Sequence, residues 1–543
     1  GGEPSRAMLA LRGARAFTRS SVRAARSHAR VRAAVLPAAV RAGATMMPEA
    51  RAFSLHGRWA PDSTEFAQAD PFNMSGLQPV TLSNLIDGEW TSTEEYTEVP
   101  DPLNGDPFIR MPDTSEEELE PFVASLAKVT KSGLHNPLSN VQRYVMYGEI
   151  SYKAALALSS PEVEDYFTRL IMRVMPKSDA QARGEVKVVA QFLKNFSGDG
   201  VRFMAQDYGV SGDHDGQSSV AYRWPYGPVT IVAPFNFPLE IPALQLMGAL
   251  YMGNKPCIKS APTVSIVLEA FIRLLHSCGM PLTDVDLLHG DSVMGKLIEH
   301  PVVRMTQFTG STAVAEHLAV ATHGKIKVED AGYDWKILGP DVGDEEFVAW
   351  QCDQDAYACS GQKCSAQSIL FMHENWNSVG LLERLEGLAA RRKLSDLTVG
   401  PVLSQTTEYM LAHAERLASI PGARVLFGGR PLQDEHSIPE KYGAIEPTAV
   451  FVPLEELVKE ENFGACATEI FGPFQVVTEF SDSSLDLVLN ATERMSHHLT
   501  AAVVSNDIKF RSSVLAATVN GTTYAGRRAR TTGAPANHWF GPA

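Results

Sequence analysis

Two cysteines five residues apart, in the segment 359-CSGQKCSAQS-368, are the residues whose type and spacing first suggest chemistry. A zinc site takes three or four ligands, and Cys359 and Cys364 have no further Cys or His close in sequence to complete one. A cysteine protease pairs its nucleophile with a His, and the nearest, His373, lies at the far end of a predicted strand after Cys364. The sequence therefore predicts neither a metal site nor a Cys-His pair here.

The commonest role of a cysteine is that of a buried core thiol, and we predict that role for Cys359 at the end of a predicted helix. Cys364 instead belongs to the Gly-containing turn 360–364, between that helix and a strand. Backbone N–H groups in such turns are free to face a ligand. From the residues alone, Cys364 is either a core thiol or a nucleophile.

Four other segments with polar residues or glycine adjoin predicted strands. They are 234-PFNFP-238, 308-FTGST-312, 327-KVEDAG-332 and 469-EIFGPF-474. Loops at one edge of an α/β sheet are where such proteins bind ligands. Taken singly, Asn236 is a turn former, Glu329 a solvated acid at a strand end, and Phe471 a core aromatic. The glycine-spaced turn 290-GDSVMG-295 is a weak phosphate signal, because no GxGxxG follows any predicted strand.

The elements that must position these residues alternate between strand and helix. Strands are predicted at 228–235, 255–260, 285–289, 304–308 and 325–329. Helices are predicted at 239–252, 292–299 and 312–322, and a further helix is predicted to begin after an N-cap at Thr263. Strands that alternate with helices over short links form a parallel sheet covered on both faces, the dinucleotide-binding architecture. A second alternating set from 345 to 522 predicts a second α/β domain, and the Gly/Asp turn within 207–225 predicts a hairpin arm.

Charge is distributed unevenly along the 543 residues. The chain carries −15 overall, and the first 58 residues, with 11 Arg and two Glu, carry +9, so the rest carries −24. Such an Arg-rich, acid-poor leader is typical of a mitochondrial presequence, predicted over 1–53. A basic nucleic-acid arm is the alternative, but an acidic body would repel a polyanion, so no nucleic-acid partner is expected. No run of 18 apolar residues predicts a membrane span, and the six cysteines show no disulfide framework.

The segment with Cys364 and the four other segments, taken in their order along the chain, resemble the aldehyde dehydrogenase superfamily. The resemblance extends from about residue 80 to the end of the chain. Within the superfamily, QKCSA with PFNF resembles the glutamate-semialdehyde (delta-1-pyrroline-5-carboxylate) dehydrogenases, and the segments 349–368 and 521–543 resemble their plant and algal branch. The resemblance implies NAD-dependent oxidation of L-glutamate γ-semialdehyde to L-glutamate in the mitochondrial matrix. An aldehyde dehydrogenase of other substrate range, or a catalytically silent scaffold subunit, are the alternatives.

The resemblance also implies an organisation of the chain. Residues 54–206 and 226–330 would form a Rossmann-type NAD-binding domain, 331–525 a catalytic domain, and 207–225 a small β arm for a homodimer or higher homo-oligomer. Residues 526–543 would begin a C-terminal segment that anchors the substrate, and the sequence ends where the family's Phe-Gly-Gly loop begins.

Site roles carry over position by position. Cys364 would be the nucleophile, Asn236 an oxyanion donor beside the Cys364 N–H, and Glu329 the base that activates the hydrolytic water. The residues implied to bind NAD are Lys259, Gly310, Ser311, Glu469 and Phe471, with Gly290 and Gly295 as weaker candidates, and those implied to bind substrate are Ser365, Gly541 and Ala543. Two positions depart from the family pattern, because Pro262 replaces a glutamate that reads the NAD ribose and Asp330 follows Glu329 directly.

Overall fold

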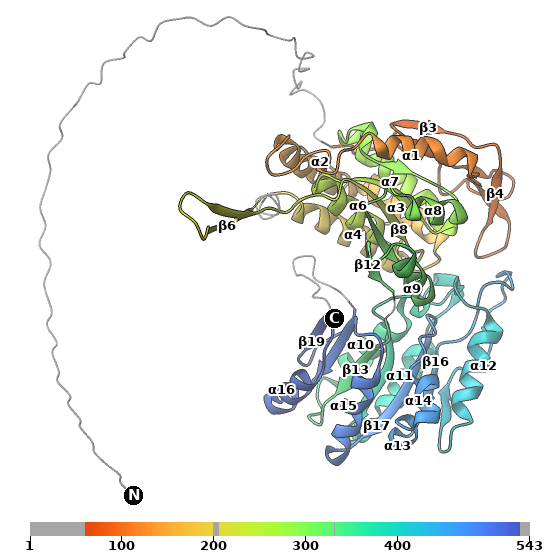
Figure 1. The fold of residues 1–543 in the computed structure, drawn as a ribbon. Helices are drawn as coiled ribbons and strands as arrows, with labels where there is room; N and C mark the ends of the chain where they lie inside the picture. The colour runs from red at the N-terminus through yellow and green to blue at the C-terminus, as the bar shows by residue number, and fades with distance from the viewer. Residues whose placement is uncertain (1–59, 199–205, 331, 533–543) are drawn as a thin grey trace, which may run out of the picture. The chain divides into compact units, whose positions relative to one another are not determined.

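The computed structural model describes residues 60–198, 206–330 and 332–532, and two seven-stranded sheets organise them (Figure 1). The first sheet has the order β12-β11-β8-β9-β10-β2-β3. Its parallel strands are β8 (Pro228–Ala233), β9 (Lys255–Ser260), β10 (Asp286–Leu287), β11 (Met305–Thr309) and β12 (Ile326–Glu329), and β2 (Asn84–Ile86) and β3 (Glu89–Thr91) join the β10 edge in antiparallel pairing.

The path of the chain through this sheet fixes where a ligand can bind. From β8 the chain moves outward to β9 and β10, then returns to β11 and β12 on the other side of β8. The order reverses between β8 and β11, and open α/β sheets bind ligands at such a switch point, beyond the carboxyl ends of the strands. Asn236 follows β8 and Gly310 follows β11, so both come from loops at that point.

Helices bury both faces of the first sheet. Successive strand residues face opposite sides, and Cys257 and Ile258 of β9 accordingly belong to different core clusters. On the Ile258 side pack α2 (Gln142–Leu158), α3 (Pro161–Val174), α4 (Asp179–Asn195), α6 (Glu240–Tyr251) and α7 (Ser265–Ser277), and on the Cys257 side α1 (Glu120–Ala127), α8 (Asp291–Glu299) and α9 (Thr312–Ala321).

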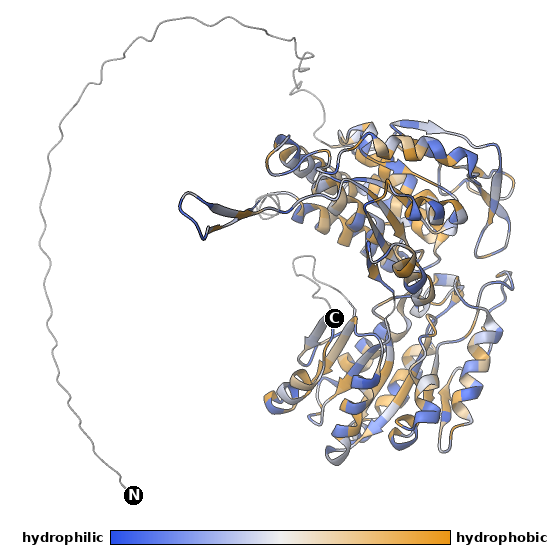
Figure 2. Cartoon of the chain, in the orientation of Figure 1, coloured by the Kyte–Doolittle hydropathy of each residue, from blue (hydrophilic) through white to orange (hydrophobic). Residues whose placement is uncertain are grey.

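The second sheet has the order β15-β16-β17-β14-β13-β18-β19, with every pair parallel except β15 with β16. Hydrophobic residues follow its strands in Figure 2. The strands are β13 (Asp334–Leu338), β14 (Gln367–His373), β15 (Arg424–Phe427), β16 (Thr448–Phe451), β17 (Phe474–Phe480), β18 (Thr500–Val504) and β19 (Thr522–Ala525).

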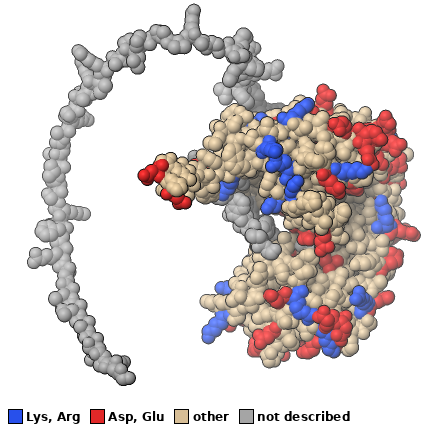
Figure 3. All heavy atoms as spheres, viewed as in Figure 1, with Lys and Arg blue, Asp and Glu red and all other residues tan. Residues whose placement is uncertain are grey.

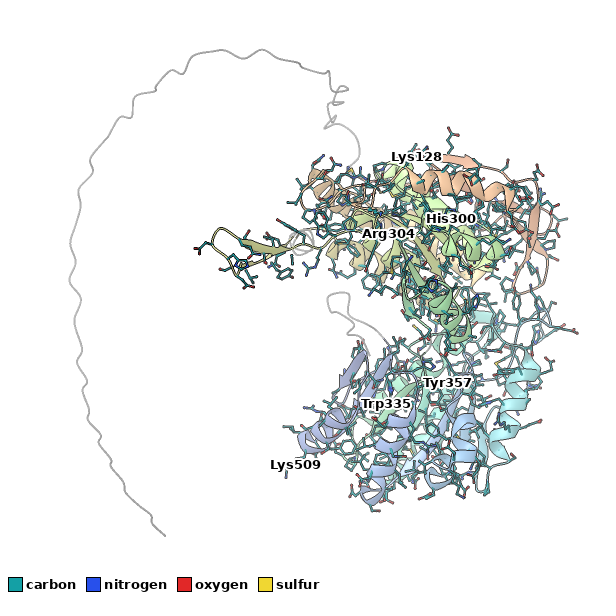
Figure 4. All side chains as sticks on the ribbon, viewed as in Figure 1. Lys128, His300, Arg304, Trp335, Tyr357 and Lys509 are labelled. Carbon is teal, nitrogen blue, oxygen red and sulfur yellow. The ribbon has the colours of Figure 1, made fainter. Side chains whose placement is uncertain are left out.

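Two helical layers cover the second sheet. Trp335 of β13, labelled in Figure 4, is fully buried on one face, and Tyr357, labelled at the end of α10, is fully buried and accepts a hydrogen bond from Gln475 Nε2 at 2.8 Å. On the Trp335 face pack α12 (Thr407–Ala418), α13 (Leu454–Leu457), α14 (Glu460–Cys466), α15 (Leu485–Arg494) and α16 (Ile508–Ala517), and on the other α10 (Glu345–Tyr357) and α11 (Leu381–Ala389).

Two smaller sheets are also present in the described part of the chain. One joins β1 (Val80–Thr81), β5 (Pro107–Pro112) and β4 (Tyr96–Pro100), and the other is a hairpin of β6 (Tyr208–Ser211) and β7 (Ser218–Ala221). All eight hairpin strand residues are exposed, and acidic side chains gather at its outer end (Figure 3). It lies within 207–225, where the sequence predicts an arm, and its role in an oligomer stays a prediction.

The predicted strands of the first sheet agree with the structure to within two residues at each end. The N-cap prediction at Thr263 is wrong, because Pro262 opens a 3-10 turn through Val264 and α7 begins after it at Ser265. The predicted presequence, 1–53, lies outside the described residues. Among the helices that the structure describes, none is both long and apolar enough to cross a membrane.

Candidate active site

The candidate site lies where the first sheet ends and the second begins. Glu329 is the last residue of β12, and β13 begins only five residues later at Asp334. Cys364 and Glu469 precede β14 and β17, at the amino ends of the second sheet. The site thus combines carboxyl ends of one parallel sheet with amino ends of another.

The loop that carries Cys364 is held in an unusual backbone conformation. Cys359, Ser360 and Gly361 have φ angles of 56°, 53° and 69°, three successive residues in the left-handed region. Each non-glycine residue there costs about 1–3 kcal/mol, and such strain gathers at functional sites. Gly361 is required for space as well, because a Cβ on it would lie 1.8 Å from the carbonyl oxygen of Gly472.

Polar side chains fix this strained loop. Gln362 is fully buried, its Nε2 donates to the Pro401 carbonyl at 3.1 Å, and its Oε1 accepts from the Leu403 N–H at 2.8 Å. Ser360 Oγ accepts from the Gly400 N–H at 2.8 Å. The segment 400–403 therefore holds the loop in place before any ligand arrives, as a pre-organised nucleophile requires.

Lys363, next to Cys364, anchors the same loop to the end of α10. Its Nζ donates to the carbonyl oxygens of Gln354 and Asp355, each at 3.0 Å. Burial lowers the pKa of Lys363 to about 8, and the Asp355 carboxylate opposes that shift.

The side chains of Cys364 and Glu329 lie close enough for each to shift the pKa of the other. Burial raises the pKa of the Cys364 thiol well above its ordinary value, and the nearby carboxyls of Glu329, Asp334 and Glu469 raise it further. Burial also raises the pKa of Glu329, although its interaction with Cys364 opposes the shift. The thiol is therefore protonated at rest, and Glu329 is positioned to accept its proton.

Gly332 makes possible the close approach between the segments that lead into β13 and β14. A Cβ at this position would lie 1.6 Å from the Cys364 carbonyl oxygen, so only glycine fits. Its N–H donates to Glu469 Oε1 at 3.3 Å. Burial raises the pKa of Glu469 to about 8. Two residues on, Phe471 has a left-handed φ of 51°, and its ring meets that of Phe235 edge-on at 5.9 Å.

Asn236 is buried, and its Oδ1 has no hydrogen-bond partner among the described residues. Its main-chain oxygen accepts from Lys177 Nζ at 2.8 Å. A buried amide with unfilled hydrogen-bonding capacity is a group that a ligand can complete. The charge of Lys177 also interacts with Cys359, so one side chain links the Asn236 turn to the loop before Cys364.

The carboxyl edge of β9 and β10 supplies the groups that a dinucleotide would meet. Lys259 is buried and forms an ion pair with Asp291. Ser260 Oγ and His289 Nε2 are buried and without partners within the described part of the chain. Burial lowers the pKa of His289 to about 3, so its ring is neutral. The unpaired polar atoms of Ser260 and His289 could form hydrogen bonds with the ribose of NAD, and the Lys259 ammonium group could contact its phosphate.

The predicted glycines of this edge differ in what they do. Gly290 has a φ of 121° and begins α8, and Gly310 leaves no room for a Cβ, which would lie 2.6 Å from the Phe308 ring. Ser311 is the N-cap of α9. Neither Gly290 nor Ser311 caps its helix through a side chain, and helix N-termini of this kind attract phosphate. Gly295 lies inside α8, where a Cβ would meet nothing within 4 Å among the described residues, and it shows no such feature.

Of the predicted substrate residues, Ser365 is described and donates from Oγ to Thr532 Oγ1 at 3.0 Å. Thr532 ends a segment held by the buried Asp355, which accepts from Arg530 Nε at 2.8 Å and from the Thr531 N–H at 2.9 Å. Gly541 and Ala543 lie outside the described residues.

Sequence reasoning missed the buried Lys177 and its partner Glu185 altogether. Neither residue belongs to a motif that was recognised. Their backbone partners, Asn236 for Lys177 and Leu239 for Glu185, lie more than 50 residues further along the chain. The only signal in the sequence was that both charged residues lie in a stretch of apolar residues at helical spacing, because a charge buried there needs a partner.

Comparison with known proteins identifies the family. The family model described as "Aldehyde dehydrogenase family" matches residues 90–541. The chain is 59% identical over 482 residues to a probable aldehyde dehydrogenase of Linum usitatissimum, and 57% identical over 483 residues to the mitochondrial delta-1-pyrroline-5-carboxylate dehydrogenase 12A1 of Arabidopsis thaliana. Each alignment covers 89% of this chain and 87% of the relative.

Solved structures agree on the fold. A NAD-dependent aldehyde dehydrogenase from Sinorhizobium meliloti aligns with a TM-score of 0.72 at 20% identity, covering 84% of this chain and 89% of that one. PnpE, solved in complex with nicotinamide adenine dinucleotide, aligns with a TM-score of 0.72 at 22% identity, covering 82% and 89%. These matches confirm the predicted α/β fold class. The chain belongs to the aldehyde dehydrogenase family.

Proposed function

We propose that the protein is an NAD-dependent dehydrogenase that oxidises L-glutamate γ-semialdehyde, the open form of delta-1-pyrroline-5-carboxylate, to L-glutamate. The observation that carries this proposal is the pairing of the Cys364 thiol with the Glu329 carboxyl, whose side chains interact directly enough to shift the pKa of one another. A thiol beside a base is what covalent oxidation of an aldehyde needs. The 57% identity with the Arabidopsis delta-1-pyrroline-5-carboxylate dehydrogenase supports this semialdehyde as the substrate.

The first step forms a covalent bond to Cys364. Glu329 takes the thiol proton, the sulfur attacks the aldehyde carbon, and the carbonyl electron pair moves onto oxygen to give a thiohemiacetal. The amide of Asn236 and the N–H of Cys364 donate to the oxygen that gains this charge. Loss of one such donor lowers the rate about 10²–10³-fold.

The second step regenerates the enzyme. When bound, NAD supplies the oxidising power, because its nicotinamide accepts the hydride that leaves the thiohemiacetal carbon. As the hydride leaves, the C=O bond re-forms and the carbon stays attached to the Cys364 sulfur as a thioester. Glu329 releases its earlier proton to solvent and then takes one from water, whose oxygen bonds to the thioester carbon. The carbon–sulfur bond breaks and the sulfur regains a proton, so Cys364 is restored and glutamate leaves.

Binding roles follow from the same edge of the first sheet. Lys259, with Gly290, Gly310 and Ser311, would hold the ribose and phosphates, and Glu469 and Phe471 would lie beside the nicotinamide ribose and ring. The unfilled buried groups Ser260 Oγ and His289 Nε2 support a polar ligand there. Ser365 would contact the substrate, since it adjoins Cys364 in sequence and bonds to Thr532.

The cellular setting is proposed on similarity. The Arabidopsis relative is named a mitochondrial protein, and the basic leader of this chain supports import into the mitochondrial matrix. The exposed β6-β7 hairpin supports a homo-oligomer, because a two-stranded hairpin is marginally stable by itself in water.

The experiment that tests the function measures NADH formation by ultraviolet absorbance. The purified protein is offered glutamate semialdehyde, succinate semialdehyde and an aliphatic aldehyde, as wild type, Cys364→Ala and the control Cys278→Ala, a buried cysteine in the core beside α7. We expect strong preference for glutamate semialdehyde, lost only in Cys364→Ala. Equal rates on all three aldehydes would refute the substrate, and no NADH from wild type would refute the function.

A further inference from the structure

Lys177 is a fully buried cation that the proposed mechanism does not use. It lies in the link between α3 and α4 with no solvent-exposed side-chain surface. Its Nζ donates to the Asn236 carbonyl oxygen at 2.8 Å and to Glu185 Oε2 at 3.0 Å. It also lies 4.5 Å from the centre of the Phe237 ring. Lys177 therefore touches both the proposed oxyanion donor and the residue after it.

Glu185, the partner of Lys177, holds the other side of the same turn. Its Oε1 accepts from the N–H groups of Leu239 at 2.9 Å and Glu240 at 3.1 Å. These are the first N–H groups of α6, and Leu239 at the N-cap has an apolar side chain that cannot satisfy them. A carboxylate from α4 thus caps α6 in place of a local residue.

The energetics argue for a role beyond stability. Removing two charges from water costs several kcal/mol per ion, and an apolar pair of similar volume is often as stable or more so. Burial alone would lower the pKa of Lys177, yet Glu185 and other nearby acids hold it above its ordinary value, so the cation persists. What an apolar pair cannot do is bond to the Asn236 carbonyl and to two N–H groups at once.

The same link also reaches the nucleophile loop. The Pro176 carbonyl oxygen lies 3.3 Å from where a Cβ on Gly400 would be, and the Gly400 N–H donates to Ser360 Oγ. The charge of Lys177 acts on Cys359 in that loop. Residues 176–177 therefore adjoin both the Asn236 turn and the support of the Cys364 loop.

We propose that Lys177, together with Glu185, is a positioning residue that fixes the Asn236 amide relative to Cys364. This inference rests on the proposed function, in which Asn236 donates to the oxyanion. Without the ammonium group the Asn236 carbonyl loses its donor, and the peptide between Asn236 and Phe237 is free to rotate. A misplacement of about 1 Å lowers catalysis about 10²-fold.

The test compares Lys177→Met with Lys187→Met, a matched control on α4 whose side chain is 65% exposed and lies 3.7 Å from Glu164. A second variant, Lys177→Met with Glu185→Gln, leaves no unpaired buried charge and keeps an oxygen that can cap α6, so it guards against misfolding. We expect both Lys177 variants to lose about 10²-fold in kcat for the semialdehyde, with KM and NAD affinity within threefold of wild type. Lys187→Met should match wild type.

Two further readouts separate positioning from general damage. If Lys177 acts through Asn236, then Lys177→Met should add less than threefold to the loss already caused by Asn236→Ala. Hydrogen exchange of the peptide 234–240, measured by mass spectrometry, should accelerate in the Lys177 variants only, and this readout needs no turnover.

The outcomes distinguish the two proposals. Wild-type kcat in Lys177→Met, a loss that multiplies fully with that of Asn236→Ala, or unchanged exchange at 234–240 would overturn the positioning role while leaving the dehydrogenase intact. A wild type without Cys364-dependent NADH formation would overturn the function, and the exchange measurement would still decide whether Lys177 fixes the turn.

Discussion

Replacing Gly332 with alanine tests the geometry of the site more directly than removing a catalytic group. The substitution adds one methyl group 1.6 Å from the Cys364 carbonyl oxygen and 2.6 Å from its carbonyl carbon. Both neighbours are backbone atoms, so no side chain can rotate away. Gly332 lies two residues before β13 and Cys364 three residues before β14, so the clash falls where two segments enter neighbouring strands of the second sheet.

The size of the effect follows from these distances. Real Cβ atoms do not approach other heavy atoms closer than 3.0 Å, so the separation must grow from 1.6 Å to at least that value. Displacement of a catalytic group by about 1 Å lowers the rate about 10²-fold, and we expect a loss of this size or larger in kcat/KM. Reaction of Cys364 with an alkylating agent should change as well, because the thiol moves relative to Glu329.

The assay combines steady-state NADH formation with thermal unfolding. Gly248→Ala in α6 is the matched control, since a Cβ there meets nothing within 4 Å in the described structure and alanine favours a helix by about 0.5–1 kcal/mol. That control should keep its activity and gain slightly in Tm. Gly332→Ala with kcat/KM within threefold of wild type would refute the inferred close contact between Gly332 and the Cys364 backbone.

Three further predictions concern charge and burial. Burial raises the pKa of Glu469 from 4.5 to about 8, so between these pH values the folded protein keeps a proton that the unfolded chain releases. The free energy of unfolding should therefore fall as pH rises from 4.5 to about 8, and Glu469→Gln should flatten that slope in denaturant titrations. Asp355→Asn should destabilise the protein by about 3–5 kcal/mol in the same titrations, because it leaves the fully buried Lys336 without its charged partner, and a loss under 1 kcal/mol would contradict this. Cys364 is half-buried, whereas the other five cysteines are buried, so it should be the cysteine that alkylates fastest, as followed by mass spectrometry. Its alkylation rate should rise with pH because its pKa is raised, and NAD should alter that rate.

The sequence predicted the elements that depend on local pattern. The apolar run 228–235 gave β8, and the alternation of strands and helices predicted from 345 to 522 is found in the second sheet and the helices that cover it. The family motifs led to Cys364 and Glu329, whose side chains interact in the structure. Their catalytic roles stay predictions until the variants are measured.

What escaped prediction depends on contacts between distant segments. Cys359 and Ser360 adopt left-handed φ angles although neither is glycine, because the segment 400–403 imposes the conformation. The strand at 334–338 was not predicted, because its five residues include a buried Asp and a buried Lys that are tolerated only through their partners. No local pattern contains such information.

The position of the site between two sheets has a consequence for when the protein becomes reactive during folding. Glu329 belongs to the first sheet and Cys364 to the second, and each sheet builds its own hydrophobic core. The thiol therefore meets its base only after both cores have formed and come together. A newly made or partly unfolded chain carries a cysteine with no base beside it, so the reactive pair is assembled by folding itself.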